Sequence, residues 1–277
     1  MKFYPHPLEG TLGKYIDSMF YYHDFFPDHS IERVVPTGHV HLIFELDGFV
    51  RNTFDNETLQ PQGAFTRAWV SGSHKNYISI SAHQKSEMFV IRFKPFGAYP
   101  FFKLPICELN NQILPAEKIW GAEVLAIREQ LRSRHYPAEK FQVAEAWLNQ
   151  VFKPDIVPAP ELLEILEKLE ASSVSEYPKI MAGYPMTQKH LIDQFKKYVG
   201  LTPKYYQRIR RFNEILQQIN QAEKIEWSQI AYQCEYSDQS HFIKEFRHFS
   251  GINPQIFIRE NYHNYGDNNF FPLDWKG

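Results

Sequence analysis

Three residues near the start of the chain have types and spacing that suit metal chemistry. His39, His41 and Glu45 are separated by even numbers of residues in the stretch GHVHLIFELDG. Because alternate side chains of a β-strand point to the same face, two imidazoles and a carboxylate would face one way. A mononuclear site of this type needs a further ligand from a later strand, and His74 and His83 are available. The same alternation also marks an ordinary barrel interior, so both interpretations stay open.

The His-x-His-x-x-x-Glu pattern resembles the first metal motif of cupin oxygenases. That resemblance implies an alternative function, a cupin-like metalloenzyme with a helical appendage. However, neither His74 nor His83 stands in the later cupin pattern. The sequence also contains no Gly-rich phosphate loop and no nucleophile signature. We therefore expect no enzyme, no cofactor and no metal, with an interior wall as the preferred role of this strand.

A second feature is a unit that the chain repeats at an offset of 51 residues. TQKHLIDQFKKYVGLTPKYY at 187–206 aligns with DQSHFIKEFRHFSGINPQIF at 238–257. Each copy has a helix-capping residue, a short amphipathic helix, a glycine stop and a proline that starts another helix. Two copies are too few for a solenoid, so the repeat predicts two helix-turn-helix units.

In a helix-turn-helix the second helix enters the DNA major groove by its N-terminal end. Polar residues near that end, opposite the apolar stripe of Phe242, Phe246 and Phe249, would contact bases. The expected base-reading residues are Gln188, Lys189 and Ile192 in the first copy, and Gln239, Ser240, Ile243 and Lys244 in the second. The residues expected to contact phosphates are His190, Lys196, Arg208, Arg211, His241 and Arg247.

The rest of the chain must position these helices, and its predicted secondary structure changes from strands to helices along the sequence. Short runs rich in Val, Ile, Phe and Tyr between turn signals predict strands up to about residue 115, in a barrel or sandwich. Helical patterns follow at about 116–152, and the proline-rich stretch 153–160 predicts a linker. We predict an α+β fold, with a β-rich sensory domain at 1–155, a DNA-binding domain at 158–262 and a tail at 263–277. In the second domain, a long helix starting near Pro203 would join the two units.

Composition places the chain among globular proteins and adds a charge asymmetry. The 277 residues carry a net charge of −2, but the stretch 178–262 has 12 Lys and Arg against 8 Asp and Glu. A basic segment attached to an acidic body fits a nucleic-acid-binding domain joined to something else. Two cysteines without metal-like spacing and no apolar run long enough to span a bilayer lead us to expect a cytoplasmic protein without a membrane partner.

IAYQCEYSDQSHFIKEFRHFSGINPQIF resembles the second helix-turn-helix of the AraC family of bacterial transcription regulators. MTQKHLIDQFKKYVGLTPKYYQRIRRF is similar to the first recognition helix and connecting helix of that family, with Arg211 at the usual arginine. The stretches VPTGHVHLIFEL, GAFTRAWVSG and RFKPFGAYPFFKLPICELNNQILPAEKIWG follow the order of the effector-type barrel of one subgroup. The resemblance implies an N-terminal domain that binds a small effector or pairs two protomers.

The first copy departs from the family pattern. Met181 replaces a small residue, Pro185 stands where glycine is common, and Asp193 places a carboxylate where phosphates would repel it. In the second copy Glu235 takes the place of the usual turn glycine. We predict that the second unit contributes more base readout than the first.

The function expected from these observations is sequence-specific binding of double-stranded DNA that regulates transcription. The two recognition helices would enter successive major grooves on one face of the duplex. A small effector or a second copy of the chain would provide control. The helical stretches 123–135 and 140–152 are either dimer surfaces or a cover for the barrel.

Overall fold

The computed structural model describes residues 1–221, 227–234, 236, 238–260 and 270–273. Glu235 and much of the predicted tail therefore lie outside the described residues. The N-terminal half is built from short strands, as the sequence pattern predicts. These are β1 (Lys2–His6), β2 (Ile16–Phe25), β3 (Ile31–Val34), β4 (Val40–Glu45), β5 (Arg51–Phe54), β6 (Pro61–Phe65), β7 (Ala68–Ser71), β8 (Ile78–Ser81), β9 (Ser86–Phe93) and β10 (Ile113–Pro115).

The strands form two antiparallel sheets. One has the order β1-β2-β9-β4-β7-β10, and the other, which includes a last strand β11 (Phe270–Leu273), has the order β11-β3-β8-β5-β6. Within the described residues no strand of one sheet pairs with a strand of the other, so the predicted barrel-like domain is an open arrangement of two sheets rather than a closed barrel.

Strand β4 shows how the sequence sets the two sides of the larger sheet. Val40, Leu42 and Phe44 belong to the core beneath the helices, whereas Ile43 belongs to a separate apolar cluster with Trp69. This division follows from the two-residue period of side chains in a strand. His41 and Glu45 share the face of Ile43, as their even spacing predicts.

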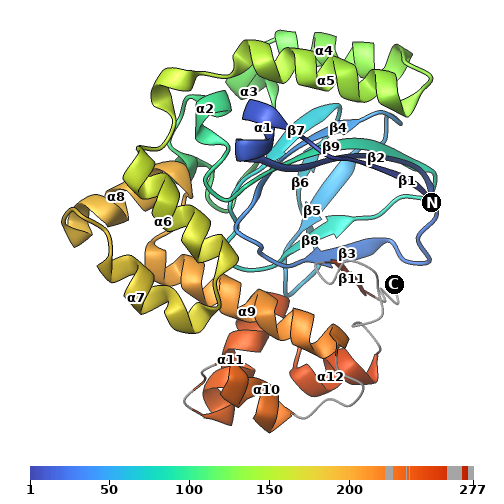
Figure 1. Ribbon diagram of the computed structural model, residues 1–277. Helices are drawn as coiled ribbons and strands as arrows, with labels where there is room; N and C mark the ends of the chain where they lie inside the picture. The colour runs from blue at the N-terminus through green and yellow to red at the C-terminus, as the bar shows by residue number, and fades with distance from the viewer. Residues whose placement is uncertain (222–226, 235, 237, 261–269, 274–277) are drawn as a thin grey trace.

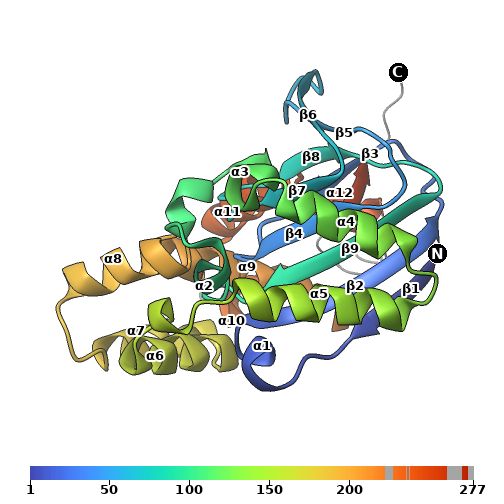
Figure 2. The ribbon, with the colours of Figure 1, turned by 90° about the horizontal axis from the view of Figure 1, so that it is seen from above.

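Short helices connect and cover the sheets. They are α1 (Gly10–Tyr15), α2 (Tyr99–Phe102), α3 (Glu117–Trp120), α4 (Glu123–Ser133) and α5 (Pro137–Val151), with 3-10 turns at Ile106–Leu109, Pro154–Ile156 and Val174–Glu176. Helices α4 and α5 lie across the six-stranded sheet (Figure 2) and bury Val124, Phe141 and Trp147 in its core. The predicted helical segment after residue 116 is therefore confirmed as a cover for the sheet.

The C-terminal half is helical: the helices within 203–259 lie on the other side of the sheets from α4 and α5, and those within 160–198 lie beside the sheets (Figure 1). Its helices are α6 (Pro160–Ala171), α7 (Tyr177–Ala182), α8 (Gln188–Tyr198), α9 (Pro203–Gln221), α10 (Trp227–Gln233), α11 (Gln239–Ser250) and α12 (Pro254–Arg259). Helix α9 is the predicted connecting helix, and Ile209, Phe212 and Ile215 along it are fully buried in a core shared by both units.

One strand comes from the far end of the chain. β11 (Phe270–Leu273) pairs antiparallel with β3, placing Phe271 opposite Arg33. Phe271 also packs against Phe257 of α12, with ring centroids 4.9 Å apart. This segment joins the N-terminal sheet to the helical half, although its sequence shows no usable periodicity. No helix in the described part of the chain is long and apolar enough to cross a membrane.

Candidate DNA-contacting surface

The two predicted recognition helices, α8 and α11, begin in the same way. Thr187 caps α8, with its hydroxyl accepting a hydrogen bond from the His190 backbone N–H at 3.2 Å. Asp238 caps α11, with its carboxylate accepting from the His241 backbone N–H at 2.8 Å. Such caps satisfy N–H groups that have no partner inside the helix. Both helix starts are therefore fixed by local chemistry, as the repeat predicts.

The apolar faces of both helices are buried, which leaves the polar faces outward. Leu191 and Phe195 of α8 are 3% and 0% exposed, and Phe242, Phe246 and Phe249 of α11 are equally enclosed. In α8 the side chains of Gln188, Lys189, Ile192 and Asp193 are exposed. In α11 Gln239, Ser240 and Lys244 are exposed, and Ile243 is half-buried. The structure thus brings each predicted set of base-reading residues to a solvent-facing surface.

The predicted phosphate-contacting residues divide into two groups. Lys196, His241 and Arg247 are exposed and follow the same helices as the reading residues. His190 is half-buried, and its ring is stacked on Tyr184 and hydrogen-bonded to the Tyr184 hydroxyl at 2.9 Å. Phosphate contact by Lys196, His241 and Arg247 stays a prediction, while His190 also packs against Tyr184 within the first unit.

Arg208 and Arg211 have partners inside the protein that sequence reasoning missed. The Arg208 guanidinium donates to Glu245 Oε1 from Nε at 2.9 Å and from its terminal nitrogen at 2.5 Å. It also lies over the ring of Tyr205, at 4.7 Å from the centroid. Arg211 lies over the ring of Tyr236 at 5.2 Å. Arg208 lies on α9 and the buried Glu245 lies on α11, so this ion pair joins the connecting helix to the second recognition helix.

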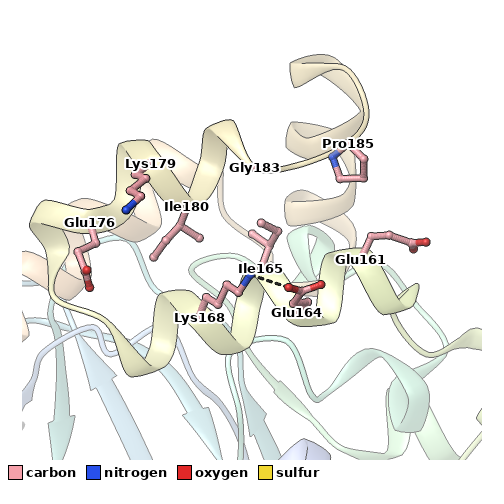
Figure 3. A pocket seen from close by; sticks show the side chains of 9 residues that line it. All are labelled: Glu161, Glu164, Ile165, Lys168, Glu176, Lys179, Ile180, Gly183 and Pro185. Carbon is pink, nitrogen blue, oxygen red and sulfur yellow. Dashed lines mark hydrogen bonds and ion pairs between the residues drawn. The ribbon is translucent and has the colours of Figure 1, made fainter.

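A groove between α6 and α7 lies beside the first unit and encloses about 440 Å³ (Figure 3). Three glutamates, Glu161, Glu164 and Glu176, line it together with two lysines. Lys168 donates to Glu164 at 2.5 Å across one helical turn, so its charge is already paired. The groove is acidic overall, and DNA phosphates would be repelled from it. It therefore lies outside the candidate DNA-contacting surface.

The metal interpretation of His39, His41 and Glu45 is not favoured. Both carboxylate oxygens of Glu45 accept hydrogen bonds from Arg51 Nε at 3.0 Å, and Oε1 also accepts from Trp69 at 2.9 Å. The ring centroids of His39 and His41 are 6.3 Å apart. Within the described residues, no group of three His, Cys, Asp or Glu side chains is placed to hold a metal ion.

These histidines are held neutral by their surroundings. Burial lowers the pKa of His39 to about 4, and a nearby pair of Asp17 and Arg92 acts on it with opposite signs. Burial also lowers the pKa of His74 to about 4 and that of His41 well below its ordinary value. The cluster is thus part of the interior wall, which is the other interpretation of the sequence pattern.

A cavity of about 290 Å³ opens between the two sheets. Amide, hydroxyl, imidazole and carboxylate groups line it beside apolar side chains, among them Asp55, Asn56, Phe65, His74, Ile78 and Ser79. Asn56 is fixed there, because its amide donates to the Tyr77 carbonyl at 2.9 Å and its oxygen accepts from the Ser79 hydroxyl at 3.0 Å. The cavity is large enough for a small polar molecule.

Comparison with known proteins agrees with this geometry. A family described as a helix-turn-helix domain matches residues 182–260, and a family described as a domain of unknown function (DUF6597) matches residues 3–115. Residues 182–260 are an AraC-type helix-turn-helix domain. The resemblance found in the C-terminal part of the sequence is therefore confirmed, and a helix-turn-helix domain of this type marks a DNA-binding transcription regulator.

Solved structures similar to this regulator include ToxT from Vibrio cholerae. An unsaturated-fatty-acid-bound ToxT is 11% identical, with a TM-score of 0.45, covering 87% of this chain and 94% of that chain. A second ToxT structure is 14% identical, with a TM-score of 0.44, covering 90% of this chain and 98% of that chain. No curated protein matches the sequence.

Proposed function

We propose that this regulator reads two successive major grooves with the N-terminal ends of α8 and α11. The observation that carries the proposal is that both helices are capped at their starts and expose polar side chains there. Donors and acceptors at such a helix end can pair with base edges in the major groove. Gln188, Lys189 and Ile192 would read bases from α8.

In the second unit Gln239, Ser240, Ile243 and Lys244 would read bases from α11. We keep the ranking that places more base readout here, because Asp193 exposes a carboxylate on the reading face of α8. Lys196, His190, His241, Arg247 and Arg211 would contact phosphates, which orient a protein on DNA without reading its sequence. Arg208 would contribute only after leaving Glu245.

The proposal divides the chain into a sensory domain at 1–155, a DNA-binding domain at 158–262 and a tail at 263–277. It assigns the chain no catalytic role and places its action in the cytoplasm. A small polar effector would bind the cavity between the sheets, whose walls offer amide and hydroxyl groups with one carboxylate. Pairing of two copies through α4 and α5 is the other proposed form of control.

Selection of bound sequences from random DNA by the full chain tests the central proposal. We expect two short preferred motifs whose centres are separated by about one helical turn, 10–10.5 base pairs. Affinity should also fall steeply with salt, because bound phosphates release counterions. Salt-steep binding without any sequence preference would show a merely basic surface and overturn the proposal.

Paired substitutions test the ranking of the two units. Gln239→Ala/Lys244→Ala should weaken specific binding by about 10- to 100-fold, in line with the value of one or two good base contacts. Gln188→Ala/Lys189→Ala should weaken it less. A matched control is Lys118→Ala/Gln60→Ala, which removes the same charge and amide from exposed positions in α3 and before β6. A larger loss from the first-unit pair would refute the ranking.

The role of the sensory domain has its own test. A small polar effector should change the DNA affinity of the wild type, because it binds one domain arrangement more tightly than another. Ala64→Leu, which narrows the cavity at one of its lining residues, should remove that response. A domain that only pairs two copies would give DNA binding that no ligand alters.

A further inference from the structure

The C-terminal ends of both recognition helices rest on the N-terminal domain. At the end of α8, the Ser73 hydroxyl donates to the Val199 carbonyl at 3.0 Å, and the Asn110 amide donates to the Gly200 carbonyl at 2.6 Å. Helix-terminal carbonyls have no partner within their helix and carry partial negative charge. Donors from the other domain therefore hold this end at a defined place.

The end of α11 is held in a similar way by different residues. Arg33 donates to the Gly251 carbonyl at 3.1 Å, and its guanidinium lies 4.8 Å from the ring centroid of Tyr77. The Tyr77 ring lies so close to Gly251 that a Cβ atom there would be 2.4 Å from it. A cationic donor and an aromatic wall thus enclose the end of the second helix.

The connecting helix α9 contacts the same part of the N-terminal domain. Its Tyr205 hydroxyl donates to the Lys75 carbonyl at 2.9 Å, and its Asn213 amide donates to the Pro36 carbonyl at 3.0 Å. We call residues 72–77, between β7 and β8, the bridging loop. Through Ser73, Lys75 and Tyr77, this one loop contacts the first unit, the connecting helix and the second unit.

We propose that the bridging loop, with Asn110 and Arg33, fixes the separation and orientation of the two recognition helices, so that the sensory domain sets the spacing of the DNA motifs the regulator accepts. This inference rests on the proposed function. Ser73, Tyr77, Asn110 and Arg33 are positioning residues, because they hold backbone or helix ends rather than DNA.

The reverse side of the bridging loop faces the cavity between the sheets. His74 and the adjoining Ile78 line that cavity, and Asn56 in its wall holds the Tyr77 carbonyl. A molecule in the cavity would therefore press on the same loop that holds both helices. Asn56 itself provides a way to disturb the loop from the cavity side, without substituting any residue of the DNA-binding units.

The test measures spacing preference in the full chain. DNA that carries the two selected motifs is lengthened or shortened by two base pairs between them, which rotates one motif by about 70° relative to the other. The wild type should bind the altered spacings at least about tenfold more weakly than the preferred spacing, as expected when one of two units can no longer make its base contacts.

The variants Ser73→Ala/Asn110→Ala, Arg33→Ala and Asn56→Ala should each reduce that preference by at least about fivefold, the factor for one lost hydrogen bond, because each removes one or two such bonds. Lys118→Ala in α3 and Gln60→Ala before β6 are controls at exposed positions outside the bridging loop, α4 and α5, and both should keep the wild-type spacing preference. Three variants in separate elements keep the test informative if one fails to fold.

Three negative outcomes are distinguishable. A wild type that selects no sequence motifs would refute the proposed function itself. A wild type with a sharp spacing preference that all three variants retain would refute only the role of the bridging loop. A merely structural contribution would weaken binding at every spacing equally, and would also count against the inference.

Discussion

Gly251, at the end of α11, offers the sharpest test of how the two halves meet. Its φ is +71°, in the left-handed region that glycine adopts freely and other residues adopt at a cost. A Cβ at this position would also lie 2.4 Å from the Tyr77 ring, which real Cβ contacts do not allow. Gly251→Ala therefore combines a backbone cost with a forced displacement of Tyr77.

The two contributions can be separated by size. The backbone contribution should be about 1 kcal/mol, the usual cost of alanine where glycine takes positive φ. Displacement of the packed Tyr77 ring adds about 1–3 kcal/mol, the usual range for overpacking. The expected loss in the free energy of unfolding is thus about 2–4 kcal/mol in the wild type, and about 1 kcal/mol when Tyr77 is already alanine.

Urea denaturation of the wild type, both single variants and the double variant measures this difference. Gly48→Ala is a control at another open glycine, because Gly48 has a φ of +101° and no atom within 4 Å of a Cβ there. Its loss should not depend on whether Tyr77 is present, because only the backbone contributes to it. An equal cost of Gly251→Ala with and without Tyr77 would show that the ring does not contact α11 in solution, and would remove one support of the spacing proposal.

Three further predictions concern local chemistry. Asp238→Ala should destabilise the second unit by about 1 kcal/mol in urea denaturation, because it removes the N-cap of α11; no change would contradict the cap. Arg208→Met leaves the buried Glu245 carboxylate unpaired and should cost about 2 kcal/mol, below the range for a fully buried pair because Arg208 is partly exposed. Its cost should nearly vanish when Glu245 is already leucine, and additive losses would argue against the pair. Burial lowers the pKa of His74 to about 4, so the unfolded state protonates this side chain at a higher pH than the folded state does. The free energy of unfolding should therefore fall as the pH drops from about 6.5 towards 4, by at most about 3 kcal/mol. His74→Gln should flatten that part of the pH–stability curve while His135→Gln should not, and equal slopes would refute the role of His74.

Much of the functional surface could be predicted because its signals are local. A cap, an apolar stripe and a glycine stop act over three or four residues, so the 51-residue repeat predicts the starts of α8 and α11 and the outward direction of their polar faces. The sequence signal for the change from strands to helices near residue 116 is also local. Each of these features needs only backbone geometry and the burial of apolar side chains.

The sequence alone thus determined the elements, the repeat and the class of protein. Only the tertiary structure decided which charges stay available and how the units are placed. Arg208 forms an ion pair with Glu245, which lies 37 residues further along the chain, and β11 pairs with β3 from the far end of the sequence. The bridging loop contacts the ends of both recognition helices. Such contacts leave no periodic trace, because they depend on where folding brings distant segments together rather than on the residues beside them.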